Sequence, residues 1–553
     1  MTQSTHKIKL NGENWVKAFF GSTAVVSVVL IILITLFLLK EGLGFFGSYQ
    51  KELALYRQSG MEFAEVVSEQ HNSLTLIYRY LESILANESK FFEELPQNHH
   101  LYKVAQIRKE RLFKLTRAFQ STKETLLDYE KEIVSLASQT RAFLELQENV
   151  SNWEKEARKL NLIEPFLFEF ETIQKREHFT FDELNSIKFY FIRNDANDLA
   201  KQVESSLEIS GLSFEKPLSN KQTKKILKSL QNTYLPLITT QEKAFRKLID
   251  QERVEFSLEN SIYEFQNTKG ALKEYLDKVP IYIQVLDEWD PDKSFPLDRA
   301  FTSFFFGKKW ITNSARQDWF GVVPLLTGSL LITFIAIIIA VPLGLGAAIY
   351  ISQSASKFEQ GIVKPFIEFI AAIPSILIGF FGISVLGGFI NEFADERLNS
   401  LTAGCLLALM AIPTIFTLAE DALNRSSLRL KQASLALGAN RWQTCYKIII
   451  PSSTSGMISA VLLGFGRVIG ETMVVLLCAG NRIAIPDFSK GLEIFAQPVH
   501  TMTGIIAQEM GEVEYEGIHY RALFMVGITL FMITLLINFL SKKVSSRFQR
   551  SHK

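Results

Sequence analysis

Residues 322–351 read VVPLLTGSLLITFIAIIIAVPLGLGAAIYI and contain no charged side chain. A hydrocarbon core about 30 Å thick needs roughly 20 apolar residues in a helix, so this segment is predicted to span a membrane. The same criterion predicts five more transmembrane segments: residues 18–39, 362–390, 401–418, 457–479 and 522–540. The first of these is too long for a signal peptide and is followed by no small-residue cleavage site. We therefore interpret it as an uncleaved anchor.

Composition supports a membrane protein with one large polar insertion. The chain has 553 residues, of which 47% are hydrophobic and 21% charged, and its formal net charge is +1. This near-neutral balance argues against a nucleic-acid-binding protein, which normally carries a basic excess. Most of the charged residues lie between positions 41 and 318, whereas long uncharged runs fill much of the C-terminal part. A soluble globular enzyme would not show this division.

Cysteine and histidine usage gives no sign of a reactive centre. The three cysteines, Cys405, Cys445 and Cys478, all lie in the hydrophobic C-terminal part, so the polar insertion cannot depend on disulfides. No metal-ligand spacing such as CxxC occurs. Spans two to six also lack the Ser/His pair, paired aspartates or zinc motif of an intramembrane protease. We expect no catalytic residue and no bound metal.

The distribution of lysine and arginine predicts the orientation, because basic short loops stay in the cytoplasm. One set of connections is basic, with Lys7, Lys9, Lys17, Lys357, Lys364, Arg425, Arg429, Lys431, Arg441 and Lys447, and the alternate connections are acidic. Six spans with both termini in the cytoplasm satisfy this pattern. The predicted domains are then a cytoplasmic N-terminus and anchor (1–40), a periplasmic insertion (41–318), a transmembrane domain (319–543) and a basic cytoplasmic tail (544–553).

The insertion is predicted to be helical. Residues 61–210 contain no glycine, and only Pro96 and Pro165 interrupt them. Since Gly and Pro punctuate local structure, their scarcity favours long helices. Apolar residues recur at helical spacing in this part, for example Val104, Ile107, Leu112, Leu115 and Phe119. We expect antiparallel helices there and a less regular part from residue 211 to 306, which makes the whole chain all-α.

The connection between spans four and five carries a distinctive pattern, QASLALGANRWQTCYKIIIP, at residues 432–451. It resembles the EAA loop of ABC importer permeases, a helix–turn–helix that docks into a groove on the ATPase subunit, although a glutamine stands where the family usually has glutamate. Small side chains permit close approach to a partner, the glycine permits a turn with positive φ, and the final proline is expected to end the segment before the membrane. The resemblance assigns ATPase coupling to Gln432, Ala433, Gly438, Ile448 and Pro451.

Charged residues interrupt the fifth span, within the sequence GFGRVIGET at residues 464–472. A charge in a membrane helix costs at least about 2.5 kcal/mol, so Arg467 and Glu471 suggest a functional site. Their spacing predicts a shared helix face on which they can pair, and Gly466 and Gly470 predict close packing against another helix. The arginine offers donors suited to a tetrahedral oxyanion. We expect Arg467, Glu471 and Thr472 to line a substrate pathway, with a purely structural salt bridge as the alternative.

Several motifs together resemble the PstC-type permease of the bacterial high-affinity phosphate importer. They are RVIGETM at 467–473, Gly480-Asn481, Ile373-Pro374-Ser375-Ile376 and the stretch from Trp310 to Leu330. The sister PstA-type permease usually continues its Gly-Glu-Thr with Ala-Pro, where this chain has Met473-Val474, so the PstC type is favoured. The resemblance covers roughly residues 300–543, and the long insertion departs from the family's short loop.

The resemblance implies a type I, MetI-like permease in the bacterial inner membrane. It also implies a second, PstA-like permease subunit, a PstB-like ATPase dimer carrying ATP and Mg²⁺, and a PstS-like periplasmic protein that delivers phosphate. The chain itself has no GxxxxGK[ST] loop, so we expect it to bind no cofactor.

Other functions are compatible with parts of the pattern. An ABC permease for another oxyanion or small solute would have the same loop pattern at 432–451 and could have the same charged residues in its fifth span. A membrane sensor would also have an anchor, a helical extracytoplasmic domain and a return helix, but here the return helix leads into four more spans and a short tail. The insertion could in addition dock the binding protein or report on it.

Overall fold

The chain forms two units that are described separately here. The computed structural model describes residues 12–97, 99, 101–160, 162, 181–209, 220–251, 256, 258–296, 298–314, 316–392, 394, 396–425 and 428–550. The insert unit comprises residues 50–296 and 315–317, and the membrane unit comprises residues 1–49, 297–314 and 318–553. Helix α1 (Gly12–Gln58) contributes residues to both units.

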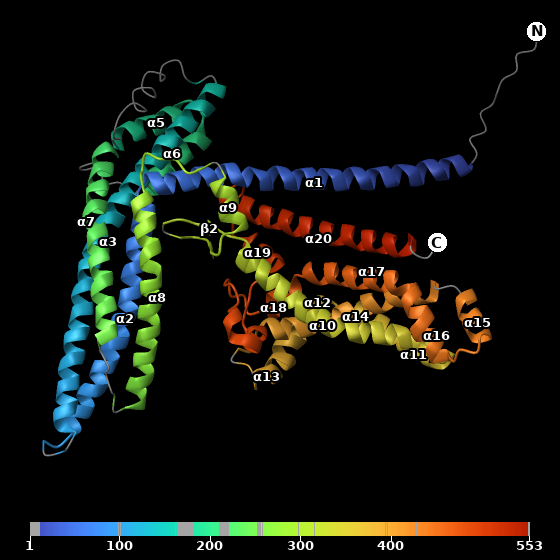
Figure 1. The fold of residues 1–553 in the computed structure, drawn as a ribbon. Helices are drawn as coiled ribbons and strands as arrows, with labels where there is room; N and C mark the ends of the chain where they lie inside the picture. The colour runs from blue at the N-terminus through green and yellow to red at the C-terminus, as the bar shows by residue number, and fades with distance from the viewer. Residues whose placement is uncertain are drawn as a thin grey trace, which may run out of the picture. The chain divides into compact units, whose positions relative to one another are not determined.

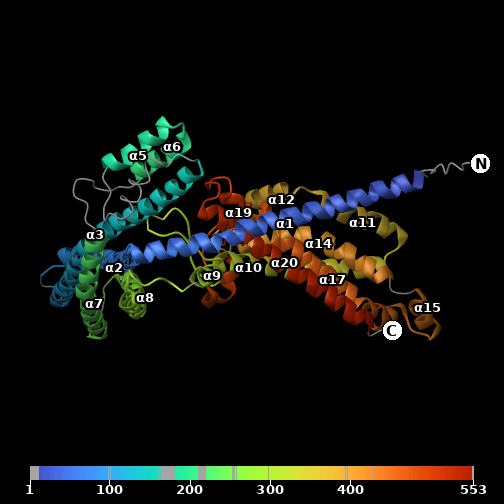
Figure 2. The same ribbon diagram turned by 90° about the horizontal axis from the view of Figure 1, so that it is seen from above.

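The insert unit is a bundle of long helices with a shorter hairpin. Figure 1 shows α2, α3, α7 and α8 running side by side, and Figure 2 shows the same grouping from above. These helices are α2 (Met61–Glu94), α3 (Tyr102–Lys159), α7 (Asn220–Gln251) and α8 (Glu259–Glu288). The hairpin of α5 (Phe181–Arg193) and α6 (Asn197–Ile209) packs on the C-terminal half of α3 through a buried cluster that includes Trp153, Ile187 and Val203. The predicted long helices are therefore confirmed for the described part.

The expectation of a less regular part from 211 to 306 was wrong, because α7 and α8 occupy most of it. Each helix contains an internal proline, Pro236 or Pro280. A proline inside a helix costs about 3 kcal/mol. In α7 four large side chains are buried at helical spacing: Leu227, Tyr234, Ile238 and Phe245. Burial of each contributes about 1.5–3 kcal/mol, which offsets the proline.

The membrane unit consists of apolar helices joined by short irregular segments. After α9 (Arg299–Phe305) comes a two-stranded antiparallel ladder, in which Trp310 of β1 (Trp310–Ile311) pairs with Phe320 of β2 (Trp319–Phe320). The helices that follow are α10 (Val323–Gln353), α11 (Lys357–Ala372), α12 (Ser375–Phe381), α13 (Gly387–Ile390), α14 (Ser400–Arg425), α15 (Leu428–Ala436), α16 (Arg441–Thr444), α17 (Ile450–Ile469), α18 (Met473–Cys478), α19 (Met502–Glu509) and α20 (Ile518–Arg550).

Five helices in the described residues are long and apolar enough to cross a membrane: Phe19–Gln58, Val323–Gln353, Ser400–Arg425, Arg441–Ile469 and Ile518–Lys543. The sixth predicted span is not one helix. Its two parts, Lys357–Ala372 and Ser375–Ile390, meet at an angle of 89°. Ile373 is extended before Pro374, because a proline disfavours helical geometry in the residue that precedes it. Five straight helices and one bent pair account for the six predicted spans.

Close packing within the membrane unit depends on small residues. Figures 1 and 2 show α10, α14 and α17 lying side by side. A Cβ atom added at Gly404 of α14 would lie 2.5 Å from Ile335 of α10, and one added at Gly344 of α10 would lie 3.0 Å from Ile415 of α14. The backbones therefore approach more closely than larger residues would allow, as is common between membrane helices. Exposed apolar side chains cover the outward faces of α1, α11 and α20.

Candidate translocation site and coupling loop

The fifth span breaks beside its arginine. Helix α17 ends at Ile469, Gly470 caps it, and α18 starts at Met473. Arg467 lies exposed in the last turn of α17, and its Nη1 donates to Thr414 Oγ1 of α14 at 2.7 Å. A helix break in a membrane protein is tolerated where backbone is buried in protein or lines a cavity, and such breaks often mark substrate sites in transporters.

The expected pairing of Arg467 with Glu471 on one helix face was wrong. The helix ends before Glu471, so the four-residue spacing no longer places the two side chains one turn apart. Arg467 forms no ion pair with any residue that the structure describes. The Glu471 carboxylate instead accepts from the backbone N–H of Met473 at 3.3 Å, and its carbonyl oxygen accepts from Thr503 Oγ1 at 2.7 Å. Thr472 is the residue immediately before α18.

The break therefore gathers one guanidinium, one carboxylate and several threonines from different helices. Arg467 comes from α17, Thr414 from α14, Thr503 from α19, and Glu471 and Thr472 from the break itself. An arginine without a carboxylate partner retains donors for an anion. Thr414 and Thr503 were not singled out from the sequence. Thr414 directly follows the only proline of α14, which is a pattern that could have drawn attention to it.

Among the residues that the structure describes, no other helix packs against Gly466 or Gly470. A Cβ atom at Gly466 would meet nothing within 4 Å, and one at Gly470 would meet only carbonyl oxygens of its own helix. The close contacts of α17 instead involve Gly456, which faces Ala422, and Gly464, which faces Ile415. In the described part of the chain the close small-residue contacts of α17 therefore lie at Gly456 and Gly464, and the packing role of Gly466 and Gly470 stays a prediction.

The loop at 432–451 forms the predicted helix–turn–helix. Gly438 has φ +86°, in the left-handed region that favours glycine. The Gly438 N–H bonds to the carbonyl of Leu435 and the Ala439 N–H to that of Ser434, which is the Schellman ending of α15. Asn440 then begins α16 with a capping box to Gln443. The two arms are joined by a buried hydrogen bond of 3.0 Å between Ser434 Oγ and Thr444 Oγ1.

Pro451 does not end this segment, contrary to expectation. It lies near the start of α17, within a helical span that runs without interruption from Arg441 to Ile469. A π-helical turn at Cys445–Ile449 precedes it, and the Ile450 N–H bonds to the carbonyl of Cys445. This wider turn accommodates a residue that has no N–H to donate, because a π-turn already shifts the hydrogen-bond register. The motif therefore continues directly into the membrane helix.

The loop also carries an exposed apolar surface that the motif does not indicate. Leu437 is 89% exposed, Trp442 70% and Tyr446 76%. Gln432 and Ala433 are exposed as well, whereas Ile448 is half-buried. Exposed aromatic side chains of this size mark contact surfaces for other proteins.

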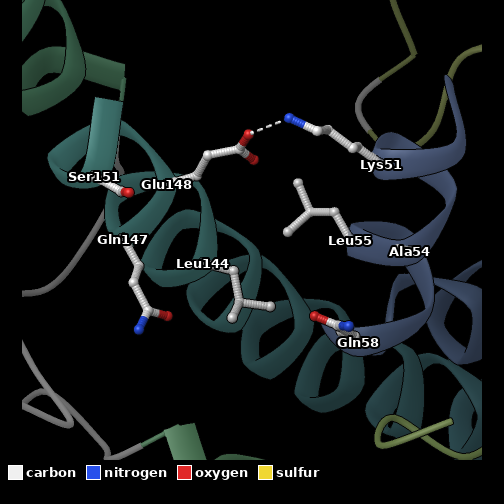
Figure 3. Close-up of a pocket in the computed structure, with 8 residues that line it drawn as sticks. All are labelled: Lys51, Ala54, Leu55, Gln58, Leu144, Gln147, Glu148 and Ser151. Carbon is white, nitrogen blue, oxygen red and sulfur yellow. Dashed lines mark hydrogen bonds and ion pairs between the residues drawn. The ribbon is translucent and has the colours of Figure 1, made fainter. Parts of the chain in front are cut away.

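The insert unit has a concave surface. A groove of about 520 Å³ is lined by Lys51, Ala54, Leu55, Gln58, Leu144, Gln147, Glu148 and Ser151, which Figure 3 shows projecting from α1 and α3. Lys51 and Glu148 form an ion pair of 3.3 Å at its edge, with both side chains more than half exposed. No group of His, Cys, Asp and Glu suited to a metal ion occurs among the residues that the structure describes.

Comparison with known proteins relates the membrane unit to transport permeases. Residues 340–550 match the family described as binding-protein-dependent transport system inner membrane component. The probable ABC transporter permease protein YqgH of Bacillus subtilis is 34% identical over 230 residues, which cover 41% of this chain and 72% of that protein. The chain belongs to the ABC transporter permease family. It is thus a multi-pass inner-membrane transport subunit rather than a catalytic enzyme.

Other relatives are named for a substrate. The phosphate transport system permease protein PstC of Pasteurella multocida is 29% identical over 287 residues, covering 48% of this permease and 85% of that protein. PstC of Haemophilus influenzae is 29% identical over 288 residues, with shares of 48% and 86%. Among solved structures, an inward-facing MetNI methionine ABC transporter matches at 19% identity and a TM-score of 0.31, over 41% of this permease and 94% of that chain.

Proposed function

We propose that this permease is the PstC-type subunit of an ATP-driven importer and forms the pathway for inorganic phosphate across the inner membrane. The observation that carries the proposal is Arg467, which is exposed at the break of a span and bonded only to the hydroxyl of Thr414 among the described residues. The names of several relatives support phosphate as the substrate.

The site chemistry suits transient binding of an oxyanion. The guanidinium of Arg467 has five N–H donors in a planar fork, and one of them is used by Thr414. The Thr414 oxygen accepts this hydrogen bond, so its own hydrogen is left to donate to a substrate oxygen. The nearby Glu471 carboxylate offsets the positive charge of the site, which keeps binding weak enough for release. Glu471 and Thr472 are proposed to line the same pathway.

The proposed assembly contains the partners that the family resemblance implies. A PstA-like permease is proposed to cover the open face at Gly466 and Gly470 of α17. A PstB-like ATPase dimer, which holds ATP and Mg²⁺, is proposed to dock on the exposed apolar surface around Trp442. A PstS-like protein is proposed to deliver phosphate from the periplasm. The basic loops support cytoplasmic termini and a periplasmic location for residues 41–318.

The test is uptake of radiolabelled phosphate by cells whose only copy of this subunit is wild type, Arg467→Gln or Arg482→Gln. Arg482 is the matched control, because it is exposed in the loop after α18 and belongs to neither the break nor the coupling loop. We expect Arg467→Gln to lower uptake at least tenfold at an unchanged membrane level, with Arg482→Gln close to wild type. Wild-type uptake in Arg467→Gln would reduce this arginine to a packing role.

The alternative substrate class is tested in the same assay. Unlabelled sulfate or molybdate is added in excess, and we expect neither to compete with phosphate. Absence of phosphate uptake by the wild type, together with uptake of another oxyanion that depends on Arg467, would favour a permease for that oxyanion instead.

A further inference from the structure

Six polar side chains form a continuous hydrogen-bonded chain through the membrane unit, from the coupling loop to the bent span. Two of them belong to α11 and α15, which Figure 1 shows at the same end of the membrane unit. In the order of their hydrogen bonds they are Lys431 (α15), Gln353 and Ser352 (α10), Asn424 and Glu420 (α14) and Lys364 (α11).

The first links connect α15 to α10 and then to α14. Lys431 Nζ donates to Gln353 Oε1 at 3.2 Å, and Gln353 Nε2 donates to Ser352 Oγ at 2.7 Å. The Ser352 hydroxyl donates to Asn424 Oδ1 at 2.7 Å. These links are half-buried or exposed, and Ser352, Gln353 and Asn424 lie in the last turns of their helices.

The last links converge on a buried carboxylate. Asn424 Nδ2 donates to Glu420 Oε1 at 3.1 Å, and Lys364 Nζ lies 2.5 Å from the same oxygen. Glu420 is 8% exposed and lies near the C-terminal end of α14. Every donor in this hydrogen-bonded series therefore points toward the negative charge of Glu420. Hydrogen bonds in such an arrangement strengthen one another. Removing one partner of this pair would leave an uncompensated charge in a buried position, so the contact is expected to hold α11 against α14.

The two ends of the chain lie on elements with distinct roles. Lys431 lies on α15, the first arm of the loop proposed to dock on the ATPase, and directly precedes its motif residue Gln432. Lys364 lies on α11, the arm of the bent span that leads to the break at Pro374. Beyond that break, α12 packs on α18: a Cβ atom at Gly379 would lie 2.5 Å from Leu477. Helix α18 begins directly after the arginine site.

We propose that these six hydrogen-bonded side chains form a coupling relay. In this relay Glu420 and Lys364 position α11 according to the position of α15. Displacement of α15 by the ATPase changes the Lys431–Gln353 contact, and the polar links pass the change to the ion pair that holds α11 against α14. The relay residues act through other groups and contact no substrate. This inference rests on the proposed function, since it assumes that an ATPase moves the loop.

The test uses the whole complex in liposomes, with ATP hydrolysis and phosphate uptake measured on the same sample. We expect Glu420→Gln to lower phosphate moved per ATP at least fivefold, while ATP hydrolysis stays within twofold of wild type. The charge exchange Lys364→Glu with Glu420→Lys is expected to restore the ratio to within twofold. Asp421→Asn is the matched control, because it removes an exposed carboxylate from the adjacent position of α14.

The measured ratio of phosphate to ATP allows three outcomes that would overturn the relay. An unchanged ratio of phosphate to ATP in Glu420→Gln would show that the ion pair does not couple the helices. A parallel loss of hydrolysis and uptake, with the ratio unchanged and no rescue by the charge exchange, would show a merely structural role. If Glu420→Gln fails to assemble, Gln353→Leu breaks the same chain without removing a buried charge, and an unchanged ratio in that variant would also refute the relay.

A second readout separates this inference from the substrate proposal. Phe358 of α11 is 77% exposed and follows Lys357 of the basic connection predicted to be cytoplasmic, so a Phe358→Cys variant can report helix movement through its rate of thiol modification. We expect ATP to change that rate at least threefold, and Glu420→Gln to abolish the change. A complex that shows this behaviour but moves no phosphate would contradict phosphate as substrate and leave the relay supported. A rate that ATP changes equally in both variants would refute the relay.

Discussion

In the insert unit Phe119 is 1% exposed and stacks on Phe245 with ring centroids 4.4 Å apart, whereas in the membrane unit Phe369 is 64% exposed. Both residues lie on long helices, so the difference is one of surroundings. The insert unit buries its aromatic rings and pairs internal charges, as Arg57 and Glu62 do at 2.8 Å. In the membrane unit many large apolar side chains face outward, and small residues such as Gly344 and Gly404 permit close approach between helices. The comparison shows that burial in a packed core and contact with lipid require opposite patterns from the same secondary structure.

The largest expected effect tests the core of the insert unit. Phe119→Ala removes a fully buried ring and is expected to destabilise this unit by about 3–5 kcal/mol. Phe113→Ala is the control on the same helix, because Phe113 is 54% exposed, and its effect should stay within about 0.5 kcal/mol. Urea unfolding of the full chain in detergent, followed by tryptophan fluorescence, measures both. Equal losses of unfolding free energy in the two variants would contradict the assignment of Phe119 to the core of this unit.

The second prediction compares one substitution in the two units. A Cβ atom at Gly328 of α10 would lie 2.1 Å from the carbonyl oxygen of His500, whereas one at Gly270 of α8 meets nothing within 4 Å. Gly328→Ala is expected to cost about 1–3 kcal/mol through overpacking. Gly270→Ala is expected to stabilise by about 0.5–1 kcal/mol, because alanine restricts the unfolded chain and favours helix. Thermal unfolding in detergent shows whether each variant is more or less stable than wild type. Destabilisation by both substitutions would contradict the prediction.

The third prediction concerns the turn of the coupling loop. Gly438→Ala places a Cβ at φ +86°, at a cost of about 1–2 kcal/mol, although the space around it is open. Under the proposed function, phosphate uptake should fall severalfold because α15 and α16 lose their mutual angle. Gly438→Asn is the matched variant, since asparagine tolerates left-handed geometry and should retain most of the uptake. Loss of uptake in both variants would point to a steric contact rather than to backbone conformation.

The smallest expected effect is a pH dependence in the membrane unit. Burial lowers the pKa of His500, whose ring accepts from the Thr501 N–H at 2.9 Å and lies 3.0 Å from Gln508 Oε1. The unfolded state therefore binds the proton more readily, and stability falls as the pH drops below about 6.5. His500→Gln should reduce this fall between pH 7.5 and 5.5, as measured by thermal unfolding in detergent. An identical pH profile in both proteins would show that other groups cause it.

Much of the fold could be predicted because the responsible interactions are local. Uncharged runs identified the spans, the absence of glycine between residues 61 and 210 indicated long helices, and Gly438 indicated the turn. The prediction failed at Pro451, where a preceding π-turn lets the helix continue, and at residues 211–306, where buried stripes offset internal prolines. In both places the surrounding structure accommodates a proline within a helix.

The sequence by itself determined which segments enter a membrane, which residues there are charged and which transport family they resemble. The length of an apolar run and the helical spacing of its side chains are properties of neighbouring residues. The tertiary structure alone decided that α17 ends before Glu471, so that Arg467 meets Thr414 and not the expected carboxylate. It also decided that Lys431 contacts Gln353 and that Lys364 contacts Glu420. These pairs are far apart along the chain, and only the packing of helices brings them within hydrogen-bond distance.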